Sequence, residues 1–399
     1  MMKPYGVGVI GCGAISRTYL KNITERFSIL KLIGVADSVP GRAEKTADEY
    51  GGRAMTSEEL LNDPDVDIVV NLTSIPIHYE VTKAALEHGK HVYSEKMMAD
   101  SFGRAKELYE LAKEKNLRIA VAPDTCLGGG YQTVRKLLDD GVIGTPLAAT
   151  AAVVRGYLPA GPESGWLSNV FCPGGTIPYD MGSYFINALL TIFGPVKRVS
   201  GFAASTKKYF THPANPNYGQ ELVIDDPDSP NLMQAAMEFE SGVLATLTAA
   251  DAGTMLFPEE GITIYGTKGR LICPDPDLFG GEIKLCVAGE QEYRVIPMLH
   301  GYSGQETAFL PVPENEDPRD VIWRHSRRGI GVTELAWALR NGRPQRLSNE
   351  MGLHAIEIVH GAATASRTGV YYTMTTPMEK MKPLRPGFIG PDAEAVFDD

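Results

Sequence analysis

The sequence predicts an α/β fold, with an N-terminal Rossmann-type doubly wound parallel sheet followed by a C-terminal α+β domain that has a large, mostly antiparallel open sheet. In the first third of the chain, short apolar runs alternate with amphipathic helix-like stretches, which is typical of βαβ units. After about residue 123, strand-like runs follow one another through tight turns, which indicates antiparallel pairing. We therefore expect two domains, at residues 1–123 and 124–399.

The apolar runs of the first domain are continuous, as expected for strands that are covered by helices on both faces of a parallel sheet. Between two of them, Thr56 and Glu59 in "TSEELL" have the spacing of a capping box, which marks a helix start. Crossovers between parallel strands are right-handed in nearly all proteins, so the alternation predicts a doubly wound sheet. The runs lie at residues 5–10, 31–37, 66–72, 91–95 and 117–123.

Two hairpins are predicted in the second domain. "MEFESGVLATL" turns at Ser-Gly, and "ITIYGTKGRLICP" turns at "GTKG". Helical patterns return near residues 328–341 and 350–367. Strands such as "LMQAAMEF" carry more apolar side chains than one buried face requires, so we expect a homodimer or homotetramer that forms through this sheet.

The bulk composition excludes several classes of protein. The chain has 399 residues, of which 43% are hydrophobic and 22% charged, as in ordinary globular proteins. Its formal net charge of −11 argues against nucleic acid and anionic membranes as partners. No apolar run reaches the length of a membrane span, and the N-terminal stretch lacks the basic region of a secretory leader, so we expect a cytoplasmic protein.

The sequence predicts no metal site. The cysteines are scattered and form no C-x-x-C pair, which argues against a disulfide scaffold and against a cysteine-built zinc site. His354 and His360 share a predicted helix but have no acidic partner at the spacing of metal ligands.

A glycine-rich turn follows the first predicted strand in "VGVIGCGAIS". Gly11 and Gly13 occupy the first two glycine positions of the dinucleotide fingerprint G-x-G-x-x-G, and Ser16 replaces the third glycine. The first glycine permits the tight turn, the second lets backbone approach a pyrophosphate, and a small serine nearly satisfies the packing demand of the third. Amide groups at the following helix start favour phosphates.

The second predicted strand ends at Asp37, where such a fold places an acid against the ribose 2′-hydroxyl. This carboxylate would repel a 2′-phosphate, so the sequence predicts NAD rather than NADP as cofactor. Arg42 could serve a phosphate, although a solvated arginine on a helix face is the simpler interpretation.

The motifs "VIGCGAIS", "VADS", "TSIPIHYE", "SEKMMAD" and "DMGSYFINALL" occur in the order and spacing of the Gfo/Idh/MocA oxidoreductase family, which the chain resembles over nearly its whole length. The resemblance implies a Rossmann domain joined to a C-terminal α/β domain. It also implies NAD(P)-dependent oxidation or reduction of one hydroxyl of a sugar or cyclitol.

Glu95 and Lys96 resemble the first two residues of the Glu-Lys-Pro motif of the family, with Met97 in place of proline. The resemblance implies that Lys96 is catalytic, at the carboxyl end of a parallel strand where doubly wound sheets bind ligands. A buried ammonium there can bond the reacting hydroxyl and tune a neighbouring base. The alternative is that the strand simply ends in charged, solvated residues.

"TSIPIHYE" resembles a loop of the family that follows the fourth strand, which implies backbone contacts to the dinucleotide. His78 either packs near the nicotinamide or is a helix-start residue satisfied by backbone. The predicted cofactor-binding residues are Gly11, Cys12, Gly13, Ala14, Ile15, Asp37, Ser38, Thr73, Ser74, Ile75, His78, Glu95 and Lys96.

"GGTIPYDMGSYF" resembles the start of a helix that carries the acid/base residue of the family. The family aspartate corresponds to Asp180, and Tyr184 stands where most members have histidine. A phenol needs a nearby cation to act as a base at neutral pH, and Lys96 could supply it. Alternatively, Asp180 is only a helix cap and Tyr184 only a core residue, since it fits the apolar stripe of its helix.

Residues that contact the substrate are predicted from their place in the sequence, after the predicted strands and within segments that resemble those of the family. Asp124 and Thr125 follow the last strand of the first domain and should face the crevice. "WRHSRRGIGVTELAWALRNGRP" resembles a segment of sugar oxidoreductases in the family, and its Arg324, His325 and Arg327 could reach the site. The predicted substrate-binding residues are Lys96, Asp124, Thr125, Arg155, Trp166, Asn169, Asp180, Tyr184 and His325.

Three functions follow from the resemblance. The first is an NAD-dependent dehydrogenase of a sugar, glycoside or cyclitol. The second is a redox-neutral glycosidase that keeps NAD bound through oxidation, elimination, hydration and reduction. The third is a non-catalytic NAD or sugar sensor, against which the presence of both Lys96 and Asp180 argues.

Overall fold

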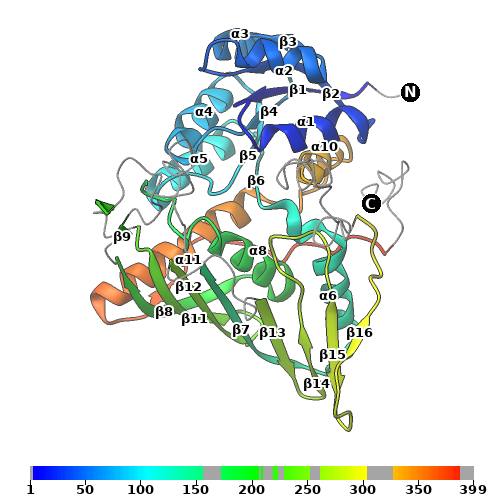
Figure 1. Cartoon of the computed structure of the whole chain (residues 1–399), viewed down its shortest axis with the longest axis vertical. Helices are drawn as coiled ribbons and strands as arrows, with labels where there is room; N and C mark the ends of the chain where they lie inside the picture. Colours follow the sequence, from blue (N-terminus) through cyan, green and yellow to red (C-terminus); the bar gives the residue numbers. More distant parts are fainter. Residues whose placement is uncertain are drawn as a thin grey trace.

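A computed structural model describes residues 3–155, 172–205, 208–209, 219–222, 229–251, 261–302 and 327–386 (Figure 1). These residues form one six-stranded, one nine-stranded and one two-stranded sheet. The two large sheets lie at opposite ends of the molecule, with helices between them (Figure 1). In the described parts of the chain, no helix is long and apolar enough to cross a membrane.

The first sheet has the strand order β3-β2-β1-β4-β5-β6, and every neighbouring pair is parallel. This order reverses direction beside the first strand, as in doubly wound folds, so the predicted Rossmann sheet is confirmed. Its short strand β3 was not predicted, because two residues carry no pattern. The strands are β1 (Tyr5–Ile10), β2 (Leu30–Ala36), β3 (Arg53–Ala54), β4 (Ile68–Asn71), β5 (His91–Ser94) and β6 (Ile119–Val121).

Helices connect these strands at the predicted places. The capping box is confirmed: Thr56 accepts a hydrogen bond from the Glu59 amide, and the Glu59 carboxylate accepts one from the Thr56 amide. The helices are α1 (Ser16–Glu25), α2 (Arg42–Tyr50), α3 (Ser57–Asn62), α4 (Ile75–Glu87) and α5 (Phe102–Glu114), and the 3₁₀ turn η1 (Asp124–Leu127) follows β6.

The second large sheet has the order β16-β15-β14-β13-β7-β12-β11-β8-β17. Both predicted hairpins are confirmed, β11–β12 and β13–β14, and only the β12–β7 pair of this sheet is parallel in the part of the chain described. Its strands are β7 (Pro146–Arg155), β8 (Val196–Ala204), β11 (Leu232–Phe239), β12 (Leu244–Asp251), β13 (Gly261–Gly266), β14 (Gly269–Ile272), β15 (Ile283–Val287), β16 (Arg294–Ile296) and β17 (Tyr372–Thr373); β9 (Lys208–Tyr209) and β10 (Glu221–Leu222) pair separately.

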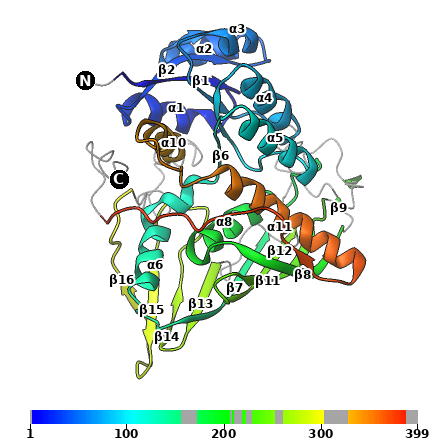
Figure 2. The ribbon, with the colours of Figure 1, turned by 180° about the vertical axis from the view of Figure 1, so that it is seen from behind.

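Helices cover the inner face of this sheet, which is the face toward the first sheet (Figures 1 and 2). They are α6 (Gly129–Asp139), α8 (Gly182–Phe193) and α11 (Asn349–Thr368). Helix α10 (Ile330–Arg340) instead packs against β5 and β6 of the first sheet. The late part of the chain therefore returns to the first domain, and the boundary at residues 123 and 124 stays a prediction.

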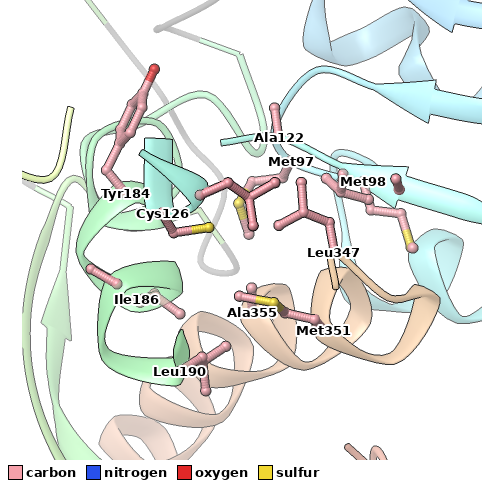
Figure 3. Packing of buried hydrophobic residues seen from close by; sticks show 14 of the residues in the cluster. Met97, Met98, Ala122, Cys126, Tyr184, Ile186, Leu190, Leu347, Met351 and Ala355 are labelled. Atoms are coloured by element: carbon pink, nitrogen blue, oxygen red, sulfur yellow. The ribbon is translucent and has the colours of Figure 1, made fainter. Parts of the chain in front are cut away.

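One continuous hydrophobic core links the two halves. Met97 and Met98 lie near Met351 of α11, and Leu190 of α8 belongs to the same hydrophobic cluster (Figure 3). Met97 is only 2% exposed, so the residue that replaces the family proline is an anchor of the core. This packing fixes the loop after β5 against the second domain.

The outer face of the second sheet has no helix over it in the described residues (Figures 1 and 2). Exposed residues of its central strands include Gln234, Ala236, Leu244 and Thr246, and the register places Leu244 opposite Ala148 and Thr246 opposite Thr150. Phe202 and Leu244 are 79% and 59% exposed on or beside this face. An apolar face of this kind is expected at an interface between copies of the chain.

Candidate active site

The glycine turn after β1 has the geometry that a pyrophosphate needs. Gly11 has φ of 101°, and a Cβ there would lie 2.7 Å from the carbonyl of Leu72, so only glycine fits. No atom lies within 4 Å of a Cβ built on Gly13, which leaves the backbone open on that side. Gly11 therefore forms a close-packed turn, and Gly13 presents an accessible backbone, as the fingerprint requires.

Ser16 substitutes for the third glycine without opening the turn. Its side chain is buried, and its hydroxyl donates to the carbonyl oxygen of Gly13 at 2.7 Å. Helix α1 begins at this residue, so its amide end faces the turn. The sequence departs here from the fingerprint, yet the serine closes the loop with its own hydrogen bond.

Asp37 lies directly after β2, with its carboxylate against the glycine turn. One oxygen accepts from the Cys12 amide at 2.7 Å, and the other accepts from the Val39 amide at 2.8 Å. The Arg42 guanidinium, 44% exposed, lies 3.2 Å from the same carboxylate. Arg42 is thus an ion-pair partner of Asp37 and not an isolated residue on a helix face.

Gly13, Ser16 and Arg42 line a cleft of about 650 Å³ at the start of α1 and α2. Its wall combines the open glycine turn with Arg17, Arg42 and Lys45, and Tyr50 adds an aromatic surface. Such a mixture fits the adenosine and phosphate parts of a dinucleotide. Ala14 and Ser38 are exposed beside it, while Ile15 is half-buried as the N-cap of α1.

The loop between β4 and α4 is fixed from within. The Thr73 hydroxyl donates to the Asn71 side chain at 2.6 Å, Ser74 is the N-cap of α4, and Ile75 is buried. His78 is 1% exposed, with Nε2 2.9 Å from the Thr73 carbonyl and Nδ1 2.9 Å from the Met97 carbonyl. Burial lowers the pKa of His78, and its contacts agree with the interpretation of a helix-start residue bonded to backbone.

Lys96 and Asp180 meet at the boundary between the two halves. The ammonium forms an ion pair with the Asp180 carboxylate and also lies 3.3 Å from the Asp180 carbonyl oxygen. The side chains are 12% and 17% exposed, so the pair is accessible from one side only. Met181, and not Asp180, is the N-cap of α8, so the Asp180 side chain serves Lys96.

Glu95 is buried beside this pair and contacts α1. One carboxylate oxygen accepts from the Tyr19 hydroxyl at 2.8 Å, and the other accepts from the Lys96 amide at 3.1 Å. The Tyr19 hydroxyl is also 3.3 Å from the Tyr93 hydroxyl. Glu95 therefore fixes the backbone of Lys96 from the side of the glycine turn. The Lys96–Met97 peptide bond is cis.

Tyr184 contacts two cations at different parts of its side chain. The Lys96 ammonium lies over the ring, 4.9 Å from its centroid. The Arg328 guanidinium donates to the hydroxyl at 2.7 Å. Tyr184 is 5% exposed, and its hydroxyl points away from the packed core (Figure 3). Burial raises the pKa of Tyr184 well above its ordinary value, against the opposing effect of Arg328.

The prediction that Asp124 and Thr125 face the crevice is not met. Both are buried, and the Asp124 carboxylate accepts from the amides of Gly329 at 2.8 Å and Gly331 at 3.2 Å. Burial raises the pKa of Asp124 to about 6. Both amides, at the start of α10, donate to the Oδ2 atom of a fully buried carboxylate, so Asp124 supports the site instead of lining it.

Several predicted residues lie outside the described part of the chain. Trp166, Asn169 and His325 are among them, and so is Arg324. Arg155 ends β7, but its side chain is not described. Their predicted contacts with substrate remain predictions.

Arg328 and its partner Asp277 could not be predicted from the sequence. The segment "RHSRRG" was singled out, but adjacent arginines look alike by pattern, and burial distinguishes this one at 8% exposure. The described residues contain no group of three histidine, cysteine, aspartate or glutamate side chains that could hold a metal. His354 instead accepts a hydrogen bond from the Val196 amide at 3.0 Å.

A glycine turn at the carboxyl end of a parallel sheet, together with a half-buried ion pair of a lysine and an acid at the same rim, defines a dinucleotide-binding oxidoreductase fold. The chain belongs to the Gfo/Idh/MocA family. Residues 5–122 match its N-terminal domain, described as "Oxidoreductase family, NAD-binding Rossmann fold", and residues 131–272 match the "GFO/IDH/MocA C-terminal domain". The expected family and its NAD-binding Rossmann domain are confirmed.

Curated relatives include dehydrogenases and a reductase. The chain is 34% identical over 151 residues to inositol 2-dehydrogenase/D-chiro-inositol 3-dehydrogenase of Lactiplantibacillus plantarum, a match that covers 35% of this chain and only 41% of that protein. It is 30% identical over 269 residues to 1,5-anhydro-D-fructose reductase of Ensifer adhaerens, covering 66% and 74%. It is 27% identical to scyllo-inositol 2-dehydrogenase (NADP(+)) of Bacillus subtilis, covering 90% and 93%.

Solved structures share the whole fold. Levoglucosan dehydrogenase in complex with NADH superposes with a TM-score of 0.72 at 18% identity, covering 94% of this chain and 100% of that one. An oxidoreductase from Agrobacterium radiobacter in complex with NAD+, L-tartaric acid and magnesium has a TM-score of 0.69 at 17% identity, covering 93% and 98%. At these identities the likeness concerns the fold.

Proposed function

We propose that the chain is an NAD-dependent oxidoreductase that oxidises a ring hydroxyl of a sugar, glycoside or cyclitol. The observation that supports this most is the ion pair of Lys96 with Asp180, set against the Tyr184 ring at the rim of the dinucleotide-binding sheet. Relatives named as inositol dehydrogenases and an anhydrofructose reductase support the class of substrate.

The residues of the glycine turn fit NAD. Gly13 leaves room for a phosphate, the start of α1 offers amides, and Asp37 offers a carboxylate at the ribose position. The glycine turn and Asp37 would hold NAD, and bound NAD would supply the acceptor for a hydride from the carbon that carries the reacting hydroxyl. The hydroxyl proton must then pass to a group of the protein.

In the proposal, Lys96 and Tyr184 have separate roles at the reacting hydroxyl. The Lys96 ammonium donates a hydrogen bond to the substrate oxygen and stabilises negative charge that builds up on it. Asp180 holds the ammonium in one place, so the ammonium needs little rearrangement during the reaction. In its phenolate form, which the Arg328 and Lys96 charges favour, the Tyr184 oxygen takes the hydroxyl proton to become the neutral phenol. Glu95 keeps the backbone of Lys96 fixed.

The proposal names a class of substrate, the polyols. A polyol offers hydroxyl groups to Lys96, Asp180 and Tyr184, which together present donors and acceptors around one reacting oxygen. The net charge of −11 does not favour a strongly anionic substrate without a local cation such as Lys96.

NADH formation tests the function directly. The purified protein is incubated with NAD and with free hexoses, inositols, and O- and C-glycosides in turn, and absorbance of NADH is followed. We expect NADH with at least one polyol class, and formation of NADH that is about 10²–10⁴-fold slower with the Lys96→Ala variant. NAD binding without NADH formation from any of these compounds contradicts the dehydrogenase assignment, and turnover of a glycoside without added NAD indicates the redox-neutral glycosidase.

A further inference from the structure

Arg328 is a buried arginine directly before α10, and it is not part of the predicted site. It is 8% exposed, and its backbone carbonyl accepts a hydrogen bond from the Asn22 side chain of α1 at 2.7 Å. One end of the residue is thus attached to the first domain. Burying a guanidinium is costly unless charged and polar partners surround it.

The partners of this guanidinium are three groups that can lose a proton. Nη2 lies 2.7 Å from the Tyr184 hydroxyl and 3.0 Å from Asp277 Oδ1, and Nη1 lies 4.0 Å from Asp124 Oδ1. Asp124 is itself held by the Gly329 and Gly331 amides. The guanidinium therefore has a fixed position, with one of its donors directed at the phenol oxygen.

The bond to the phenol distinguishes Arg328 from Lys96. Lys96 contacts the ring face of Tyr184 and its ammonium is paired with Asp180, whereas Arg328 contacts the hydroxyl oxygen itself. A guanidinium stays protonated at all accessible pH values, so its charge at this oxygen does not depend on the reaction. A cation that donates to a phenol oxygen favours the phenolate over the phenol.

We propose that Arg328 is a positioning residue that acts through Tyr184, holding the phenol oxygen in place and supplying the charge that allows it to exchange a proton. This inference rests on the proposed function, in which Tyr184 takes the substrate proton. The sequence predicts Lys96 as the activating cation, whereas the contacts assign this role to Arg328. Lys96 keeps its role at the substrate oxygen.

The charges around Tyr184 support this role. Burial raises the pKa of its hydroxyl, Arg328 lowers it, and the nearby carboxylates Asp277, Glu95 and Asp180 raise it again. The Lys96 ammonium faces the ring. Removing Arg328 leaves the hydroxyl among carboxylates, so its proton should then leave only at higher pH.

A kinetic cycle separates action through Tyr184 from a general structural role. We expect Arg328→Met to lower kcat by ~10²-fold, with the limb of the pH–rate profile moved to higher pH, and Arg328→Lys to recover part of the loss. In a Tyr184→Phe background, Arg328→Met should lower kcat little further, because the two residues act as one unit. If the fold-loss of kcat in the double variant equals the product of the two single losses, the proposal is overturned.

Arg135 offers a matched control. It is 7% exposed and donates to the Thr191 carbonyl at the far end of α8, away from Tyr184. Arg135→Met should lower the melting temperature without moving the pH–rate profile of the folded protein. A profile that shifts equally in both variants overturns the role of Arg328.

A spectroscopic measurement tests the inference without turnover. With 13Cζ-labelled tyrosine, the NMR resonance that disappears in Tyr184→Phe belongs to Tyr184, and its shift reports ionisation and hydrogen bonding. We expect Arg328→Met to move this resonance, because the phenol oxygen then loses the guanidinium that donates to it. An unmoved resonance overturns the inference; absence of dehydrogenase activity with a moved resonance contradicts the proposed function alone.

Discussion

The Lys96 ammonium pairs with the Asp180 carboxylate across the boundary between the two halves of the molecule. Lys96 follows β5 of the first sheet, and Asp180 precedes α8 of the second domain. Neither half alone contains the pair, so the site exists only while the two halves are packed together. The core around Met97 and Met351 is what maintains this packing (Figure 3).

Tyr184→Phe tests whether the phenol exchanges the proton. The change keeps the packed ring and removes only the hydroxyl that Arg328 contacts. We expect kcat to fall by ~10²-fold and the ionisation of Tyr184 to vanish from the pH–rate profile, while the melting temperature changes little. A variant with parental kcat and an unchanged profile shows that Tyr184 is a core residue, with Asp180 the next acceptor to test.

Asp37 and Arg42 should have opposite effects on cofactor choice. Asp37→Ala removes the carboxylate that faces the ribose, so we expect NADH to bind ~10-fold or more weakly and NADPH to bind better. Arg42→Ala frees the carboxylate from its ion pair and removes a cation that a 2′-phosphate could use, so NADPH binding should weaken. Calorimetric dissociation constants for both cofactors measure this; parental cofactor preference in both variants refutes the assignment.

Asp124→Asn should change how stability depends on pH. Burial raises the Asp124 pKa from 3.8 to about 6, so the folded state binds the proton more tightly than the unfolded state. The parent should therefore lose up to ~3 kcal/mol of unfolding free energy as pH rises through this window, and nothing further above it. The asparagine variant lacks this dependence.

Urea unfolding of both proteins across that pH window gives the difference in their unfolding free energies. The difference should vary in the window and be constant above it. A difference that is the same at every pH contradicts a raised pKa for Asp124.

The open face of the second sheet should form an interface between copies. Light scattering of the parent should give a dimer or tetramer, and Leu244→Glu should shift it toward the monomer, because a charge on this face must lose its hydration in the interface. Ile77→Glu on α4 of the first domain, also exposed, is the matched control. A monomeric parent at micromolar concentration rules out this interface.

Local patterns predicted the fold well because each depends on neighbouring residues. Continuous apolar runs marked the parallel strands, and the Ser-Gly and "GTKG" turns marked two hairpins. The glycine turn was equally local as a pattern, since Gly11 and Gly13 follow directly after β1 and precede α1. Such features need no knowledge of distant segments.

Contacts between distant segments could not be predicted in this way. Asp124 stands at a strand end that usually faces ligands, yet amides from Gly329 and Gly331 cover its carboxylate. Arg328 has charged neighbours in sequence, and only its burial against Tyr184 shows its role. Family resemblance, and not spacing, indicated that Lys96 and Asp180 belong to one site.

Lys96→Ala tests the central claim most directly, with Lys90→Ala as its control. Lys96 follows β5 and pairs with Asp180, whereas Lys90 precedes β5 and its ammonium bonds only backbone carbonyls among the contacts described, those of Asp63 and Val66. The single measurement is kcat of each variant on a polyol that yields NADH, at saturating NAD. We predict a loss of about 10²–10⁴-fold for Lys96→Ala, with unchanged NAD affinity, and parental kcat for Lys90→Ala. Near-parental kcat in Lys96→Ala would contradict the account.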